Sequence, residues 1–94
     1  MTQSIRIKLP VYAFWDVDRE KLDLEKDKGF IISRIFERAK LDDIFTIVAL
    51  YGRDATISIL KRNKYLNRQG LYLAHAILGT PLQNFKAYAF LKHR

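Results

Sequence analysis

The sequence predicts an all-α fold, a compact orthogonal bundle of about five short helices preceded by an extended N-terminal arm. The chain has 94 residues, of which 49% are hydrophobic, enough for the core of one small domain. Apolar residues recur at helical spacing through most of the chain after residue 25. Glycine or asparagine interrupts these segments at short intervals, which favours short crossing helices over long parallel ones. We therefore expect a single domain, with the arm over residues 1–11 and the bundle over residues 12–94.

The arm is predicted from an alternating pattern. Residues 4–9 alternate apolar and basic side chains, which is the period of a half-buried strand, and Pro10 ends the segment. A lone strand needs a pairing partner. Either the segment lies on the helices as an arm, which we favour, or it pairs with the same segment of a second copy in a homodimer.

The clearest amphipathic helix begins near Glu25. Five apolar residues share one of its faces: Ile31, Ile32, Ile35, Phe36 and Ala39. Residues 44–51 are apolar on nearly every side, so we expect a central helix there, capped by Asp42 or Asp43. Gly52 has the position of a left-handed residue that ends a helix.

Three more helices complete the prediction. Asp54 is expected to cap the third helix, which ends near residue 61. Asn67 opens the fourth helix and Gly79 ends it. Residues 80–83, Thr-Pro-Leu-Gln, are a typical start for a fifth helix, with Thr80 as its cap. The expected inner face of that helix has three apolar residues: Leu82, Phe85 and Ala89.

Several classes of protein are excluded by composition. The chain has no cysteine, which excludes disulfides, zinc–thiolate sites and thiol catalysis. No apolar run approaches the ~20 residues of a membrane span. The first ten residues have too little apolar length for the core of a signal peptide. We expect a soluble, cytoplasmic protein that binds no cofactor and no membrane.

Two features resemble catalytic or metal sites and are better explained otherwise. Asp16-Val17-Asp18 has the form of a paired-carboxylate metal site, but it lacks the Gly-Ser loop and the sheet that carry such pairs in nucleotidyltransferases. Helix capping by Asp18 and backbone bonding by Asp16 account for the same residues. His75 has no carboxylate, serine or second histidine at ligand spacing. We expect that the protein is not an enzyme.

An aromatic cluster is the candidate surface for a protein partner. Tyr12, Phe14 and Trp15 have the composition of interface anchors. The alternative is that Phe14 and Trp15 close one end of the bundle as part of its core.

A basic segment is the candidate surface for nucleic acid. The net charge of +7 favours a polyanion or an acidic protein as partner. The candidate phosphate-binding residues are Arg53, Lys61, Arg62, Lys64 and Arg68. Residues 44–62 have about the size of a helix-turn-helix, but Ala55, Thr56 and Ser58 would face the bases, and none of them reads base edges well. The alternative is an ordinary solvated turn.

Two segments carry a resemblance to a known family. Residues 14–18, Phe-Trp-Asp-Val-Asp, and residues 28–34, Lys-Gly-Phe-Ile-Ile-Ser-Arg, resemble an uncharacterised family of small bacterial proteins. Its members read roughly Leu-Phe-Trp-Asp-Val-Asp, then Phe-Ile-Ile-Glu-Arg-Val-Leu, a Tyr-Gly junction and Leu-Gly-Ile-Pro. Residues 51–52 and 78–81 match the later landmarks. The chain departs from the pattern at Ala13, where leucine is usual, and at residues 44–47, where the family is rich in tryptophan.

The resemblance implies a partner rather than a reaction. Such proteins are commonly encoded beside a nucleotidyltransferase-type toxin of the abortive-infection class, which implies an antitoxin or accessory role. We therefore expect a regulatory or protein-interaction module that is antitoxin-like. The second hypothesis is a basic, helix-turn-helix-like transcriptional regulator that binds nucleic acid.

Overall fold

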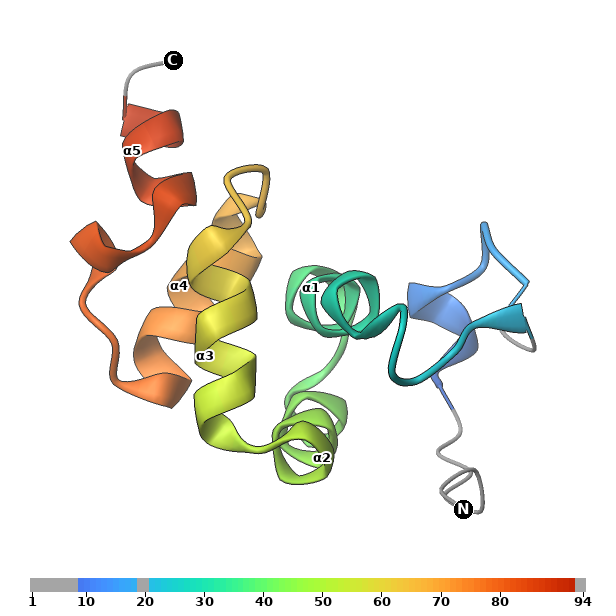
Figure 1. Cartoon of the computed structure of the whole chain (residues 1–94). Coiled ribbons are helices and arrows are strands. Elements are labelled where there is room, and N and C mark those ends of the chain that lie inside the picture. Colours follow the sequence, from blue (N-terminus) through green and yellow to red (C-terminus); the bar gives the residue numbers. More distant parts are fainter. Residues whose placement is uncertain (1–8, 19–20, 93–94) are drawn as a thin grey trace.

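The computed structural model describes residues 9–18 and 21–92, and these ranges are all-helical, as the sequence predicts (Figure 1). The elements are η2 (Val11–Ala13), α1 (Lys28–Arg38), α2 (Leu41–Tyr51), α3 (Arg53–Arg62), α4 (Arg68–Leu78), η4 (Leu82–Asn84) and α5 (Lys86–Lys92). The described ranges contain no strand. The strand expected at residues 4–9 lies outside the described residues except for Leu9, which is buried.

Helices α1 and α2 cross α3 and α4 at steep angles. Figure 1 shows α1 nearly end-on, whereas α3 beside it lies lengthwise in the plane of the view, with α4 behind α3. Helix α1 packs against α2, α3 and α4, and α3 also packs against α2, α4 and α5. The segment before α1 and helix α5 lie at opposite ends of this group. The expected orthogonal arrangement is therefore present.

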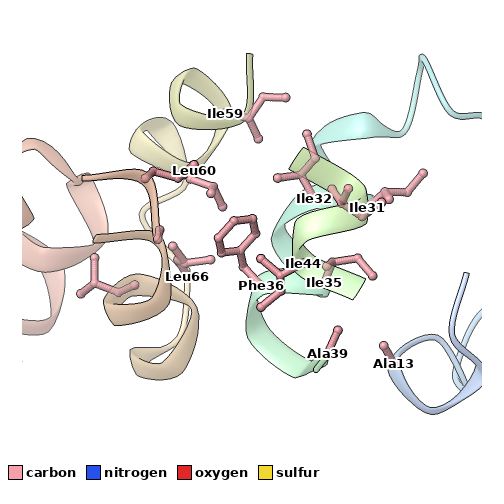
Figure 2. Packing of buried hydrophobic residues seen from close by; sticks show 14 of the residues in the cluster. Ala13, Ile31, Ile32, Ile35, Phe36, Ala39, Ile44, Ile59, Leu60 and Leu66 are labelled. Atoms are coloured by element: carbon pink, nitrogen blue, oxygen red, sulfur yellow. The ribbon is translucent and has the colours of Figure 1, made fainter. Parts of the chain in front are cut away.

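The core is centred on α1. Its residues Ile31, Ile32, Ile35 and Phe36 are fully buried, and Ala39 at its end is 7% exposed, which confirms the predicted inner face. Figure 2 shows Phe36 in the middle of the packed side chains, between α1 and the side of the core that carries Leu60 and Leu66. Burial of each such side chain stabilises the fold by about 1.5–3 kcal/mol.

The caps of helix α4 are the predicted residues, Asn67 and Gly79. The side chain of Asn67 caps this helix, because its Oδ1 accepts a hydrogen bond of 2.8 Å from the N–H of Gly70. Gly79 ends α4 with φ of 70° and ψ of 22°, the left-handed conformation. Gly52 also has a positive φ, 92°, but its ψ of 149° makes it an extended junction between α2 and α3 rather than a left-handed cap.

The predicted aspartate caps are wrong. The N-cap residues of α2 and α3 are Lys40 and Gly52, and neither makes a side-chain cap hydrogen bond. Asp42, Asp43 and Asp54 lie in the first turns instead. A negative charge there interacts favourably with the positive end of the helix dipole, which explains aspartates two or three residues after the N-cap.

Helix α2 is not central, contrary to prediction. Ile44 and Ile47 are buried, but Leu41 and Phe45 on its outer side are 52% and 53% exposed. The helix packs against α1 and α3, and its outer apolar side is left toward solvent.

The last helix starts later than predicted. Residues 82–84 form the 3₁₀ turn η4, and α5 begins at Lys86. Thr80 does not cap a helix; it is buried, and its carbonyl oxygen is 2.7 Å from Nδ1 of His75. The break lets the side chain of Phe85 enter the core, and Ala87 rather than Ala89 then faces inward.

Candidate functional site

The predicted aromatic cluster divides into a buried and an exposed part. Phe14 is fully buried, whereas the next residue, Trp15, is 72% exposed. A turn closes over this pair, because the N–H of Val17 donates to the carbonyl of Phe14 at 3.1 Å. The prediction of Trp15 as a surface residue is therefore compatible with the structure, and the alternative that it fills the core is wrong.

Phe14 belongs to the core and is not available as a partner-binding residue. Its ring packs edge-to-face with that of Phe30, with centroids 6.1 Å apart at 67°. The guanidinium of Arg34 lies 4.6 Å from the Phe30 centroid and 5.9 Å from that of Phe14. Neighbouring residues in a tight turn point in different directions, and here the smaller of the two rings points inward.

Arg34 contacts the chain on both sides of Trp15, through the backbone of Ala13 and the side chain of Asp16. Its Nη1 donates to the carbonyl oxygen of Ala13 at 3.2 Å and to Oδ1 of Asp16 at 2.6 Å. Only 12% of the Arg34 side chain is exposed. The Arg38 guanidinium adds a weaker contact to Asp16 at 3.7 Å. The exposed indole thus projects from a turn that is fixed to α1.

Asp16 pairs with two arginines of α1, in addition to the local backbone hydrogen bond predicted for it. The hydrogen bond from Arg34 is the main reason that the pKa of the Asp16 carboxyl is lowered. A carboxylate already paired with two arginines is a poor cation ligand. Among the described residues, no group of three or more His, Asp or Glu side chains is placed to hold a metal ion.

Tyr12 links the same segment to the start of α2. Its hydroxyl donates to Oδ2 of Asp43 at 2.7 Å and accepts a hydrogen bond of 2.9 Å from the N–H of Lys40. The hydrogen bond with Asp43 is also the main reason that the pKa of Tyr12 is raised. The ring remains 45% exposed, so Tyr12 both fixes the segment and adds apolar surface.

The predicted basic residues do not form one patch. Arg53 is the first residue of α3, and its Nη2 donates to the carbonyl of Leu78 at the end of α4. Lys61 and Arg62 lie at the other end of this ten-residue helix, about 14 Å away along its axis. Arg53 therefore stabilises the end of α4 and is separate from the other four candidates.

The other four basic residues flank a junction that is docked on α1. The Nδ2 of Asn63 donates to Oγ of Ser33 at 2.9 Å, and Oε2 of Glu37 accepts a 3.0 Å hydrogen bond from the N–H of Asn67. Beside the junction lies an open groove of about 680 Å³. The tyrosine of the junction, Tyr65, borders this groove and is 70% exposed. The sequence identified the basic residues but not the groove.

Helix α3 lacks the surface of a recognition helix. Thr56, one of the predicted base-facing residues, is fully buried, and its Oγ1 donates to the carbonyl of Gly52 at 2.7 Å. Asp54 and Ser58 are exposed, and neither can make the bidentate contacts that specify guanine or adenine. The arrangement of α2 and α3 does not favour the helix-turn-helix hypothesis.

Comparison with known proteins places the chain in a family. The model of DUF6922, a family of unknown function, matches residues 9–60, more than half of the 94 residues. The chain belongs to this family. The DUF6922 match contains the Trp15 turn, α1, α2 and most of α3, but not the junction between α3 and α4. No curated protein and no solved structure matched the chain. In the part of the chain that the structure describes, none of the helices is long and apolar enough to cross a membrane.

Proposed function

We propose that the chain is a protein-interaction module without catalytic activity, whose binding surface is centred on Trp15. The observation that supports this is an indole that is 72% exposed on a turn fixed by Arg34 at Ala13 and Asp16. Tryptophan is enriched among the few residues that dominate binding energy at protein interfaces. A side chain presented on a fixed turn loses less backbone entropy on binding than one on a mobile loop.

The energy available from this side chain is substantial. An aromatic side chain buries about 150–250 Å², and apolar burial is worth about 25 cal/mol per Å². Burial of the exposed part of Trp15 by a partner is therefore worth roughly 3–4 kcal/mol. The half-exposed ring of Tyr12, three residues earlier, extends the apolar surface.

The partner in this proposal is a nucleotidyltransferase-type toxin, and the chain is its antitoxin. The support is the resemblance to small bacterial proteins that are commonly encoded beside such toxins. An antitoxin needs a binding surface and no catalytic group. In agreement with this, Trp15 is the most exposed large hydrophobic side chain described in the family-matched residues 9–60.

The test is affinity capture from native cell lysate with two matched variants. Trp15→Ala removes the proposed anchor, and Tyr72→Ala removes another exposed aromatic ring, 46% exposed, on α4. Wild type and Tyr72→Ala are expected to retain one nuclease-resistant protein, identified by mass spectrometry, that Trp15→Ala loses. Thermal unfolding of the three proteins shows whether the loss is due to folding. A partner retained equally by Trp15→Ala contradicts the proposal.

A further inference from the structure

The groove at the α3–α4 junction has a chemistry different from that of the Trp15 turn. It lies between α1 with the turn before it, the end of α3 and the segment after α3, and its volume is about 680 Å³. Its lining includes the rings of Phe30 and Tyr65 and the basic side chains of Lys26, Lys28 and Arg62. The groove thus combines two partly exposed aromatic rings with an excess of positive charge.

The two rings are positioned by their neighbours. Asn63 positions Tyr65, because its Oδ1 accepts a hydrogen bond of 2.9 Å from the Tyr65 N–H. The Tyr65 ring packs edge-to-face against Phe90 of α5, with centroids 5.5 Å apart at 76°. Phe30 borders the groove from α1 and is 38% exposed. Rings that are exposed yet fixed are suitable platforms for stacking of flat ligands.

The charges of the groove favour an anion. Three basic side chains of its lining, Lys26, Lys28 and Arg62, face two acidic ones, Glu25 and Glu37, because the fourth basic side chain, Arg34, is mostly buried and paired with Asp16. Glu25 is paired with Lys28 at 3.0 Å, and Glu37 accepts the Asn67 N–H. Lys64 extends the positive charge beyond the groove, with its Nζ 5.4 Å from the centroid of Tyr65.

We propose that this groove binds single-stranded nucleic acid. Unpaired bases stack on Tyr65 and against the exposed part of Phe30 that Arg34 does not cover, and the phosphates lie near Arg62, Lys26 and Lys28. Stacking on exposed rings beside a positively charged groove is the usual way in which proteins bind single strands without reading their sequence. A duplex keeps its bases stacked on each other and leaves the two rings without a ligand. This inference is independent of the proposed function, because it concerns another surface.

The test measures fluorescence anisotropy of labelled oligonucleotides with the full chain. The probes are oligouridylate, oligothymidylate and a DNA duplex of equal length, each at several salt concentrations. We expect both single strands to bind more tightly than the duplex, with a salt slope of about −2 if roughly three phosphates are neutralised. Tyr65→Ala is expected to weaken single-strand binding by about tenfold, from the loss of one stacked base. Arg62→Gln is expected to reduce the salt slope by about 0.7.

Two control variants separate this site from other surfaces. Tyr72→Ala removes an exposed ring outside the groove, and Trp15→Ala removes the proposed protein anchor; both are expected to bind single strands like the wild type. Tyr65 is 70% exposed, so its replacement is expected to leave the unfolding midpoint nearly unchanged. Equal affinity for duplex and single strands, no effect of Tyr65→Ala, or no binding at low salt would each overturn the inference. A preference between the two single strands distinguishes RNA from DNA as the ligand.

Discussion

Arg34 donates one hydrogen bond of 2.6 Å to the carboxylate of Asp16, across 18 positions of sequence. The same Nη1 reaches the carbonyl of Ala13 at 3.2 Å. One side chain of α1 therefore binds the backbone before Trp15 and the side chain of the residue after it. The neighbouring ring of Phe14 is buried against α1, so the turn has an inner and an outer aromatic residue. The presentation of Trp15 to a partner depends on this arrangement.

Replacement of Arg34 tests whether the turn depends on it. Arg34→Met keeps much of the aliphatic packing but removes the hydrogen bonds to Ala13 and Asp16. We expect the free energy of unfolding in urea to fall by about 1–3 kcal/mol, because a part-buried carbonyl loses its donor. Lys28→Met is the matched control: its ion pair with Glu25 is exposed, so we expect a change below about 1 kcal/mol. Equal effects of the two substitutions would contradict the proposed role of Arg34.

Acid titration provides a second test of the Arg34–Asp16 pair. The hydrogen bond from Arg34 lowers the pKa of Asp16 in the folded protein below its value in the unfolded chain. The pair therefore contributes stability above the unfolded-state pKa, and this contribution is lost as the pH falls through the folded-state pKa. Asp16→Asn is expected to be less stable than wild type at neutral pH, and the difference is expected to shrink in acid. Unfolding midpoints measured over this range check the prediction; a constant difference would contradict it.

Tyr51 is expected to titrate late. Burial, followed by the negative charges of Glu25, Asp23 and Asp27, raises its pKa to about 12. Its hydroxyl donates to the carbonyl of Leu24 at 2.7 Å, which attaches the turn before α1 to the end of α2. Because the folded-state pKa is the higher one, this contribution to stability is complete below the unfolded-state value of about 10 and is lost as the pH rises through about 12.

Ultraviolet titration of tyrosinate measures this property directly. Tyr51→Phe is expected to remove the last-titrating tyrosine and to leave the rest of the curve in place. The same variant loses the hydrogen bond to Leu24, so we expect it to be about 1 kcal/mol less stable at neutral pH. Persistence of the late step in Tyr51→Phe would assign it to another tyrosine.

Gly70 lies where α4 packs tightly against Leu66 and Glu37. A Cβ there would lie 2.9 Å from Cδ1 of Leu66 and 3.1 Å from Cγ of Glu37. Gly70→Ala is therefore expected to destabilise the fold by about 1–2 kcal/mol, since overpacking outweighs the gain in helix propensity. Gly29→Ala in α1 is the control, because its Cβ would meet Cγ2 of Ile59 at 4.0 Å, an ordinary contact. We expect that variant to be at least as stable as wild type in denaturant unfolding, and the opposite order would contradict the packing described.

The elements that could be predicted are those with local causes. The inner face of α1, the Asn67 cap and the left-handed Gly79 each depend on residues within one or two helical turns. The outer side of α2 could not be predicted, because periodicity does not show which side of an apolar helix finds a partner. The sequence predicts aspartate caps for α2 and α3, but the N-caps are Lys40 and Gly52, two or three residues before those aspartates.

The candidate site was only partly predictable, because its contacts join distant parts of the chain. Phe14 and Trp15 are adjacent aromatic residues, and only the packing of Phe14 against Phe30 shows which one is buried. Tyr12 contacts Asp43 across 31 positions, and Arg53 contacts Leu78 across 25. Such contacts follow from how the helices cross, which no short-range pattern in the sequence determines.

The central claim is that Trp15 is the anchor for a protein partner. Trp15 is the one tryptophan in the sequence, so fluorotryptophan incorporated into the chain gives a fluorine NMR signal that belongs to it alone. The measurement is titration of this labelled protein with the partner obtained by affinity capture, with calorimetry on the same samples. The account predicts that the Trp15 signal shifts and loses its sensitivity to solvent in proportion to the bound fraction. Binding that is seen by calorimetry while the Trp15 signal stays unchanged would contradict it and place the interface elsewhere.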